Sequence, residues 1–151
     1  MNFTPSKLNL FTFFKLPMVW WSGIRVVVFE KNYCEVNVRH RWINQNPFKS
    51  MFWAVQGMAA ELTTGVLLMH EIQISKQKIS MLVLNNKANF SKKARGRILF
   101  SCAPEDKIAK AIEQLIKTKE PQTLWLISKG VDENQDVVST FEFEWTLLLK
   151  K

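Results

Sequence analysis

The sequence has few of the residues from which covalent and metal-bound sites are built. Its 151 residues include two cysteines, two histidines, five glycines and one tyrosine. Cys34 and Cys102 stand far apart in no metal-ligand spacing, so we expect two buried thiols in a reducing compartment, and hence a cytoplasmic protein. A glycine-rich phosphate loop, a His-Glu zinc motif and a carboxylate cluster are all missing, so neither a metal ion nor a required cofactor is expected.

Acidic residues are also scarce. The chain has 13 of them against 21 lysines and arginines, which gives a net charge of +8. This excess favours an anionic partner such as nucleic acid, a membrane surface or a phosphorylated small molecule, although many proteins are basic for solubility alone. The basic connection 91–97 lacks the spacing of RNA- or DNA-binding motifs, so nucleic acid is the least expected of these partners.

Uninterrupted hydrophobic runs are missing as well. The longest apolar segment, 50–69, holds Gln56 and Glu61, and an acid in mid-bilayer costs about 3 kcal/mol on insertion scales. We therefore predict a buried helix here and no membrane span. The apolar stretch near the N-terminus lacks a cleavage site, so residues 1–22 are interpreted as a helical segment capped by Thr4 rather than as a signal peptide.

The rest of the chain alternates between strand and helix patterns. Phe141, Phe143, Trp145 and Leu147 alternate with polar residues, which is typical of a half-buried strand. Apolar residues cover nearly every face of segment 51–69, so this helix should be central. The predicted strands are 23–30, 34–42, 80–88, 97–102, 122–128 and 137–149, and a second helix is predicted at 105–118. This order indicates an α+β fold whose largely antiparallel sheet wraps around the apolar helix.

Glu61 stands out because it is the only charged residue between Lys49 and His70. On a helical wheel it lies among small and apolar residues, namely Ala54, Gly57, Gly65 and Leu68. A lone buried carboxylate is costly unless it is paired, hydrogen-bonded or protonated, and such groups are kept mostly where chemistry needs them. Two interpretations stay open. Glu61 is a functional acid, or it is exposed or paired with an arginine of a neighbouring strand.

The histidines are weaker candidates. His70 should lie near a helix C-terminus, where the helix dipole favours an imidazolium ion. His40 could face Cys34 along one strand, but this spacing carries no catalytic signature.

Two segments resemble a known family. Residues 46–61 resemble the helix region of hotdog-fold acyl-CoA thioesterases, and are most similar to an uncharacterised group related to the phenylacetic-acid-pathway thioesterases. Residues 90–96 are similar to the strand-turn element that follows the helix in this family. The resemblance implies a single hotdog domain over residues 1–151, with an N-terminal helical segment at 1–22 and the hotdog core at 23–149.

The resemblance also implies roles for particular residues. Glu61 would act as nucleophile or general base, and Asn46 would help place the water or the carbonyl. The oxyanion would be stabilised by backbone N–H groups at the start of the helix, namely those of Phe52, Trp53 and Ala54. Coenzyme A would be part of the substrate. Its phosphates would be held by three basic side chains, those of Lys92, Lys93 and Arg95. Members of the family form homodimers by joining two sheets side by side, and tetramers are a further option.

The sequence departs from the family at the junction of loop and helix. Many active members carry His-Gly-Gly there, whereas this chain has Lys49-Ser50-Met51 followed by bulky Phe52 and Trp53. The main hypothesis is therefore an acyl-CoA thioesterase, and the alternative is a non-catalytic module that binds acyl-CoA or another amphipathic ligand. A third hypothesis, based on charge, is binding to nucleic acid or to a membrane surface.

Overall fold

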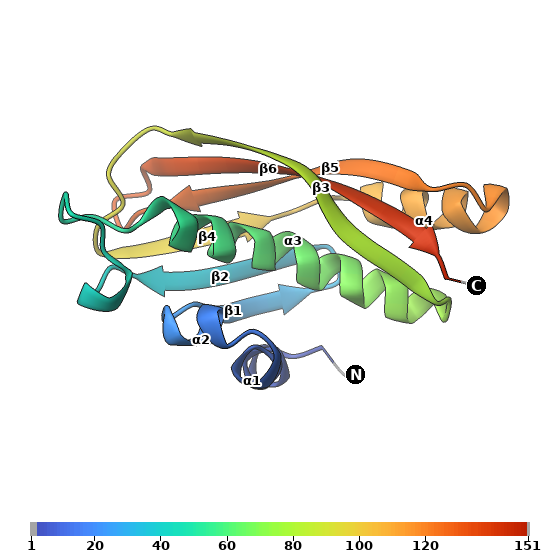
Figure 1. Ribbon diagram of the computed structural model, residues 1–151, viewed down its shortest axis with the longest axis horizontal. Coiled ribbons are helices and arrows are strands. Elements are labelled where there is room, and N and C mark those ends of the chain that lie inside the picture. Colours follow the sequence, from blue (N-terminus) through green and yellow to red (C-terminus); the bar gives the residue numbers. More distant parts are fainter. Residues whose placement is uncertain (1–2, 151) are drawn as a thin grey trace.

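A six-stranded antiparallel sheet curls around one long helix (Figure 1) in a computed structural model that describes residues 3–150. The helices are α1 (Pro5–Lys15), α2 (Pro17–Trp21), α3 (Trp53–Ser75) and α4 (Lys107–Thr118), with a short 3-10 helix η1 (Trp42–Asn44). The strands are β1 (Arg25–Glu30), β2 (Tyr33–Arg39), β3 (Ile79–Phe90), β4 (Arg97–Cys102), β5 (Gln122–Val131) and β6 (Val137–Leu149). They lie in the order β1-β2-β4-β5-β6-β3. The predicted α+β hotdog architecture is confirmed.

Helix α3 is central because it is apolar on nearly every face. Its buried side chains include Ala59, Ala60, Leu67 and Leu68, which pack against the concave side of the sheet. Among residues 3–150, no helix is both long and apolar enough to cross a bilayer.

Helix α3 continues beyond the predicted end at residue 69. It ends only at Ser75, where Lys76 takes a left-handed conformation with φ of 56° and its N–H bonds to the Gln73 carbonyl. The placement of His70 near the helix C-terminus was therefore wrong, because His70 lies more than a turn before the end, with its ring edge-on to Phe29.

The second predicted strand was too long. Strand β2 ends at Arg39, and Trp42 lies in η1 with 84% of its surface exposed. The turn is fixed by Asn44, whose side chain accepts a hydrogen bond from the Arg41 N–H and donates to the carbonyls of Ser22 and Arg39. A side chain that satisfies backbone groups in this way offers the chain an alternative to the strand ladder.

The two edge strands of the sheet, β1 and β3, differ in whether another element covers them. At β1, the side-chain amide of Asn9 in α1 bonds to both the N–H and the carbonyl of Val26, each at 2.9 Å, as a neighbouring strand would. Strand β3 pairs only with β6 within residues 3–150, and its second half is exposed. An uncovered edge of twelve residues is a template for pairing with another strand.

The two cysteines, distant in sequence, lie directly opposite each other on β2 and β4. Both thiols are buried and free, as expected. Burial raises the pKa of Cys102 to about 12, so the thiols behave as apolar core groups.

Candidate functional site

Glu61 lies in an apolar pocket of about 210 Å³ on the side of α3 that faces α1 and α2. This Glu61 pocket is lined by Phe11, Leu16 and Val19, by Met58, Leu62, Gly65, Val66 and Met69 of α3, and by Met81 and Trp145 of the sheet. One side is open to solvent, so Glu61 counts as an exposed residue, but its neighbours are apolar. These neighbours keep water away from the Glu61 carboxyl, and this desolvation raises its pKa above the ordinary value.

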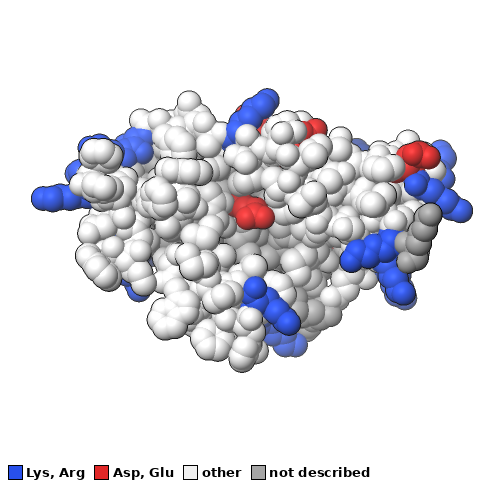
Figure 2. Space-filling model, in the orientation of Figure 1, with Lys and Arg blue, Asp and Glu red and all other residues white. Residues whose placement is uncertain are grey.

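The Glu61 carboxylate has no hydrogen-bond or ion-pair partner within residues 3–150. Pairing with an arginine of a neighbouring strand is therefore not found, whereas exposure of Glu61, the other part of that interpretation, is found. The centre of this face of the molecule carries very little charge (Figure 2). Glu61 is thus an unpaired acid in apolar surroundings, a setting typical of carboxyl groups that act as acids or bases.

Three other polar side chains in the first half of α3 differ, because each has a partner in the sheet. Gln56 accepts a hydrogen bond from Ser139 at 2.8 Å, and Thr63 donates to Ser128 at 2.9 Å. Thr64 accepts from the indole N–H of Trp145 at 3.0 Å. These groups anchor the helix to the sheet, and a buried polar group that is paired costs little.

The small residues beside Glu61 serve packing. A side-chain carbon at Gly57 would lie 3.4 Å from the Phe141 ring, and one at Gly65 would lie 3.6 Å from the Trp145 ring. The groups packed against these glycines are therefore aromatic side chains of β6.

The start of α3 borders a second pocket, of about 410 Å³. This helix-start pocket is lined by Asn46, Phe48, Ser50, Met51, Trp53, Gln56 and residues 90–94. Phe52 precedes the helix and its N–H bonds to the Asn44 carbonyl at 2.9 Å, so this amide is occupied. The N–H groups of Trp53 and Ala54 have no partner within residues 3–150 and stand at the positive end of the helix dipole.

Asn46 holds the loop that leads into α3. Its Oδ1 accepts hydrogen bonds from the N–H of Phe48 at 2.9 Å and of Ser50 at 3.3 Å, and its Nδ2 donates to the Ser50 hydroxyl at 3.0 Å. The side chain nevertheless lines the helix-start pocket. Its role in the structure is thus to shape the pocket through the loop.

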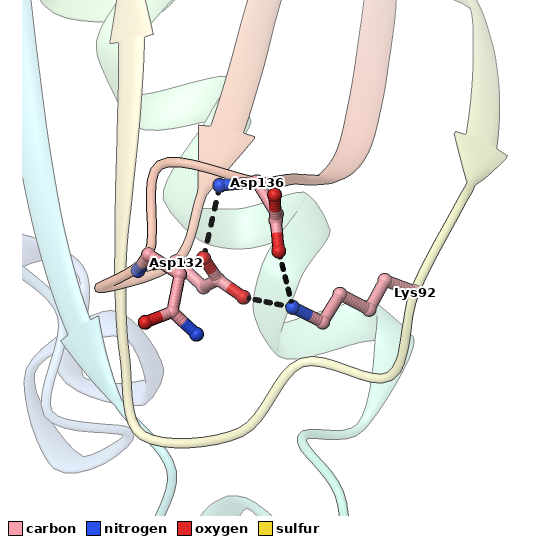
Figure 3. Close-up of polar contacts among 4 residues, drawn as sticks. Lys92, Asp132 and Asp136 are labelled. Atoms are coloured by element: carbon pink, nitrogen blue, oxygen red, sulfur yellow. Dashed lines mark hydrogen bonds and ion pairs between the residues drawn. The ribbon is translucent and has the colours of Figure 1, made fainter.

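The three candidate cations of the basic connection lie in different settings. Lys92 is clamped by two carboxylates of the β5–β6 turn, with its Nζ 2.6 Å from Asp132 and 2.8 Å from Asp136 (Figure 3). Hydrogen bonds from the Lys92 ammonium group hold the pKa of Asp132 below its usual value. Lys93 lines the helix-start pocket, and Arg95 is exposed, and neither has an acidic partner within residues 3–150.

The structure brings Asn46, Trp53 and Lys93 together but leaves Glu61 apart from them. The two pockets share no lining residue. Trp53 and Glu61 are eight positions apart (61 − 53 = 8), which is about 12 Å along a helix axis. Sequence reasoning missed this separation, and it also missed Phe90 and Met81, which place opposite ends of β3 at the two pockets.

The remaining sequence candidates do not join either pocket. Cys34 faces the core, whereas His40 lies beyond the end of β2 with a buried Nε2 that has no partner within residues 3–150. His70 approaches the neighbouring Glu71 at 3.8 Å on the other half of α3.

Comparison with solved structures gives the class of protein. A Pseudomonas aeruginosa protein of unknown function, described as a probable thioesterase, has a TM-score of 0.87 at 20% identity, with 99% of each chain covered. A Haemophilus influenzae thioesterase has a TM-score of 0.72 at 13% identity, covering 99% of this chain and 93% of that one. A thioesterase from Staphylococcus aureus has a TM-score of 0.69 at 11% identity, covering 87% and 98%. The protein has a thioesterase-like hotdog fold.

The sequence itself gives the family. The chain belongs to the family described as a domain of unknown function, DUF4442, whose sequence profile matches residues 6–147. No curated protein matches the chain.

Proposed function

We propose that this protein hydrolyses an acyl thioester, with Glu61 as the reacting acid. The observation that carries the proposal is the unpaired carboxyl in the Glu61 pocket, because its pKa is raised by desolvation alone. Glu61 either removes a proton from a water that attacks the thioester carbonyl, or attacks the carbonyl itself. In the first route water adds to the carbonyl, the C–S bond breaks, and the carboxylic acid and the thiolate are the products. In the second route the thiolate leaves first, and water then hydrolyses the mixed anhydride on Glu61 to release the carboxylic acid.

The start of α3 would stabilise the oxyanion. The N–H groups of Trp53 and Ala54 point out of the helix end without a partner within residues 3–150, and developing negative charge on the carbonyl oxygen is favoured there. The Phe52 amide, also expected in this role, is occupied by Asn44. Lys93 and Arg95 are the cations that would meet the phosphates of coenzyme A, because Lys92 is held by two carboxylates.

The distance between donors and acid favours a site shared by two copies of the chain. A carbonyl group cannot touch both Trp53 N–H and Glu61 of one helix across about 12 Å. Strand β3 offers the way to join two copies, because it is an uncovered edge that exposes Leu82 and Leu84.

The geometry of β3 fits a symmetric dimer. Met81 borders the Glu61 pocket and Phe90 borders the helix-start pocket, and nine residues (90 − 81 = 9) of extended chain separate them by about 30 Å. In a twofold antiparallel pairing about the middle of the strand, the Phe90 end of one copy lies beside the Met81 end of the other. Each helix-start pocket then meets the Glu61 pocket of the second copy.

One relative has two substituted residues with the same spacing as Asn46 and Glu61. Two structures of the Staphylococcus aureus protein carry single substitutions, of a glutamine at position 32 and of a glutamate at position 47, which are fifteen positions apart (47 − 32 = 15). Asn46 and Glu61 are also fifteen positions apart (61 − 46 = 15). A cytoplasmic location and the kinship with the phenylacetic-acid-pathway group stay predictions.

The proposal is tested by hydrolysis of short, long and aromatic acyl-CoAs, followed through release of the free thiol. Turnover of one class is expected, with a loss of about a thousandfold in Glu61→Gln. Glu113→Gln, an exposed acid of α4, is the matched control and should keep full activity. Equal turnover in Glu61→Gln and the wild type would refute the role of Glu61.

The second candidate is a non-catalytic module that binds acyl-CoA. It is favoured by the bulky start of the helix and by Asn46, whose side chain is already engaged in its own loop. A folded protein that binds acyl-CoA without releasing thiol from any of the three classes would select this candidate.

A further inference from the structure

Helix α1 carries apolar residues on its outward side as well as on its inward side. Inward, Leu8 is fully buried in the core, Asn9 bonds to Val26, and the buried Thr12 hydroxyl donates to the Asn9 carbonyl. Its outward side carries Leu10, Phe13 and Phe14, and Phe14 is 69% exposed. An exposed helix face is normally polar, so these outward apolar residues indicate a face that something else covers.

Helix α2 continues the same surface. The Phe13 ring meets the Trp20 ring edge-on at 5.2 Å, which joins the two helices, and Trp21 is 67% exposed. We define the aromatic face as the outward apolar residues of both helices, namely Leu10, Phe13, Phe14, Met18 and Trp21. The exposed Trp42 and Ile43 of η1 adjoin it, because Asn44 of η1 bonds to the carbonyl of Ser22 after α2.

The charged side chains of residues 3–29 are all basic, although Phe11, Leu16 and Val19 of this segment also line the pocket of the acid Glu61. The sequence has no acidic residue before Glu30, whereas Lys7 and Lys15 lie at the two ends of α1. Arg25 stacks on the Trp20 ring at 3.4 Å, and Arg41 lies close by. Burial, and then the neighbouring charge of Arg41, lower the pKa of Arg25.

None of these four cations has an acidic partner within residues 3–150. In Figure 2 the lower half of the view, where α1 and α2 lie in Figure 1, shows basic side chains and no acidic ones.

We propose that the aromatic face docks on the surface of an anionic lipid bilayer. Phenylalanine and tryptophan side chains enter the boundary between headgroups and acyl chains, and lysine and arginine reach the negative headgroups around them. Anionic lipid supplies the charge that the chain itself lacks on this face.

A second copy of the chain is disfavoured as the occupant, because a symmetric contact would bring the lysines and arginines of both copies together. Docking in this orientation has a consequence for the Glu61 pocket. Phe11, Leu16 and Val19 of the same N-terminal segment line that pocket, so its wall would lie next to the lipid.

The test is sedimentation of the full chain with vesicles of phosphatidylcholine alone or mixed equally with phosphatidylglycerol. Strong binding is expected only to the mixed vesicles, and added salt should weaken it. Phe14→Ser with Trp21→Ser should weaken binding about a hundredfold, because two apolar anchors are lost. Ile74→Ser with Ile127→Ser removes two apolar residues elsewhere that are about half exposed, and should leave binding unchanged.

The charges are tested separately. Lys7→Gln with Lys15→Gln should weaken binding about fivefold for each lysine, and Lys110→Gln with Lys117→Gln on α4 is the matched control. Glu61→Gln should bind as the wild type does, so that a failure of hydrolysis and a failure of docking stay distinguishable.

The proposal is overturned if the wild type stays in the supernatant with the mixed vesicles. It is also overturned if the aromatic and control variants bind equally well. A change of oligomeric state in Phe14→Ser with Trp21→Ser, measured by light scattering, would assign the aromatic face to contact between copies instead.

Discussion

The two pockets along α3 contain different kinds of groups. The helix-start pocket has free backbone donors at Trp53 and Ala54 and a cation at Lys93, but no acid among its lining residues. The Glu61 pocket has an acid in apolar surroundings and no other charged lining residue. Hydrolysis of a thioester needs an oxyanion site and a base around one carbonyl group. Under the proposed function, neither pocket is therefore complete in one chain, and β3, which borders both, is the element through which two chains would complete them.

The largest effect expected on the helix-start side comes from Trp53→Pro. Proline removes the N–H but fits the first position of a helix, and Phe52 before it is already extended, with ψ of 133°. Loss of one oxyanion donor should lower kcat about a hundredfold to a thousandfold. Steady-state hydrolysis measures it, and Trp53→Ala, which loses the same exposed ring but keeps the N–H, is the control. Equal kcat values in the two variants would show that the Trp53 N–H does not stabilise the oxyanion.

A smaller effect is expected from the cations. Lys93→Ala with Arg95→Ala should raise KM for acyl-CoA about tenfold with little change in kcat, because contacts with the phosphates are lost. The same thioester on pantetheine, which lacks those phosphates, should show no change in KM. Lys92→Ala should instead lower the melting temperature, since it breaks the clamp on Asp132 and Asp136. A tenfold rise in KM in Lys92→Ala alone would reverse this assignment.

The smallest effect concerns stability and pH. Desolvation raises the pKa of Glu61 in the folded chain above its unfolded value, so between these two pKa values the folded state binds more protons. Stability from this group therefore falls as pH rises through that window. Glu61→Gln should melt at a slightly higher temperature than the wild type above the window and at the same temperature below it. If the melting temperature of the wild type instead rises relative to that of Glu61→Gln as pH increases, the carboxylate has a stabilising partner.

Much of the fold could be predicted because its patterns are local. Strand β6 was expected at 137–149 and is found there, since Phe141, Phe143 and the residues around them alternate without a break. The end of α3 was missed because no glycine or proline follows Met69 to stop the helix. Trp42 was placed in a strand because its apolar side chain fitted the alternation, whereas Asn44 turns the backbone there.

The candidate site could be predicted only in part. Glu61 was visible because a single charge interrupts an apolar helix. The clamp on Lys92 was not, because its partners follow 40 and 44 residues later (132 − 92 = 40, 136 − 92 = 44) in a turn that only the β5–β6 hairpin brings near. The division between two pockets was also hidden, since it depends on how α1, α2 and β3 surround α3.

Co-expression of Trp53→Pro with Glu61→Gln tests the shared site most directly. If each site combines the helix start of one copy with Glu61 of the other, a mixed dimer has one intact site. Half of the dimers are then mixed and half of their sites work, so about a quarter of wild-type activity should return. If the site lies within one chain, the mixture will show no more activity than the two variants measured separately, and that result would contradict the account.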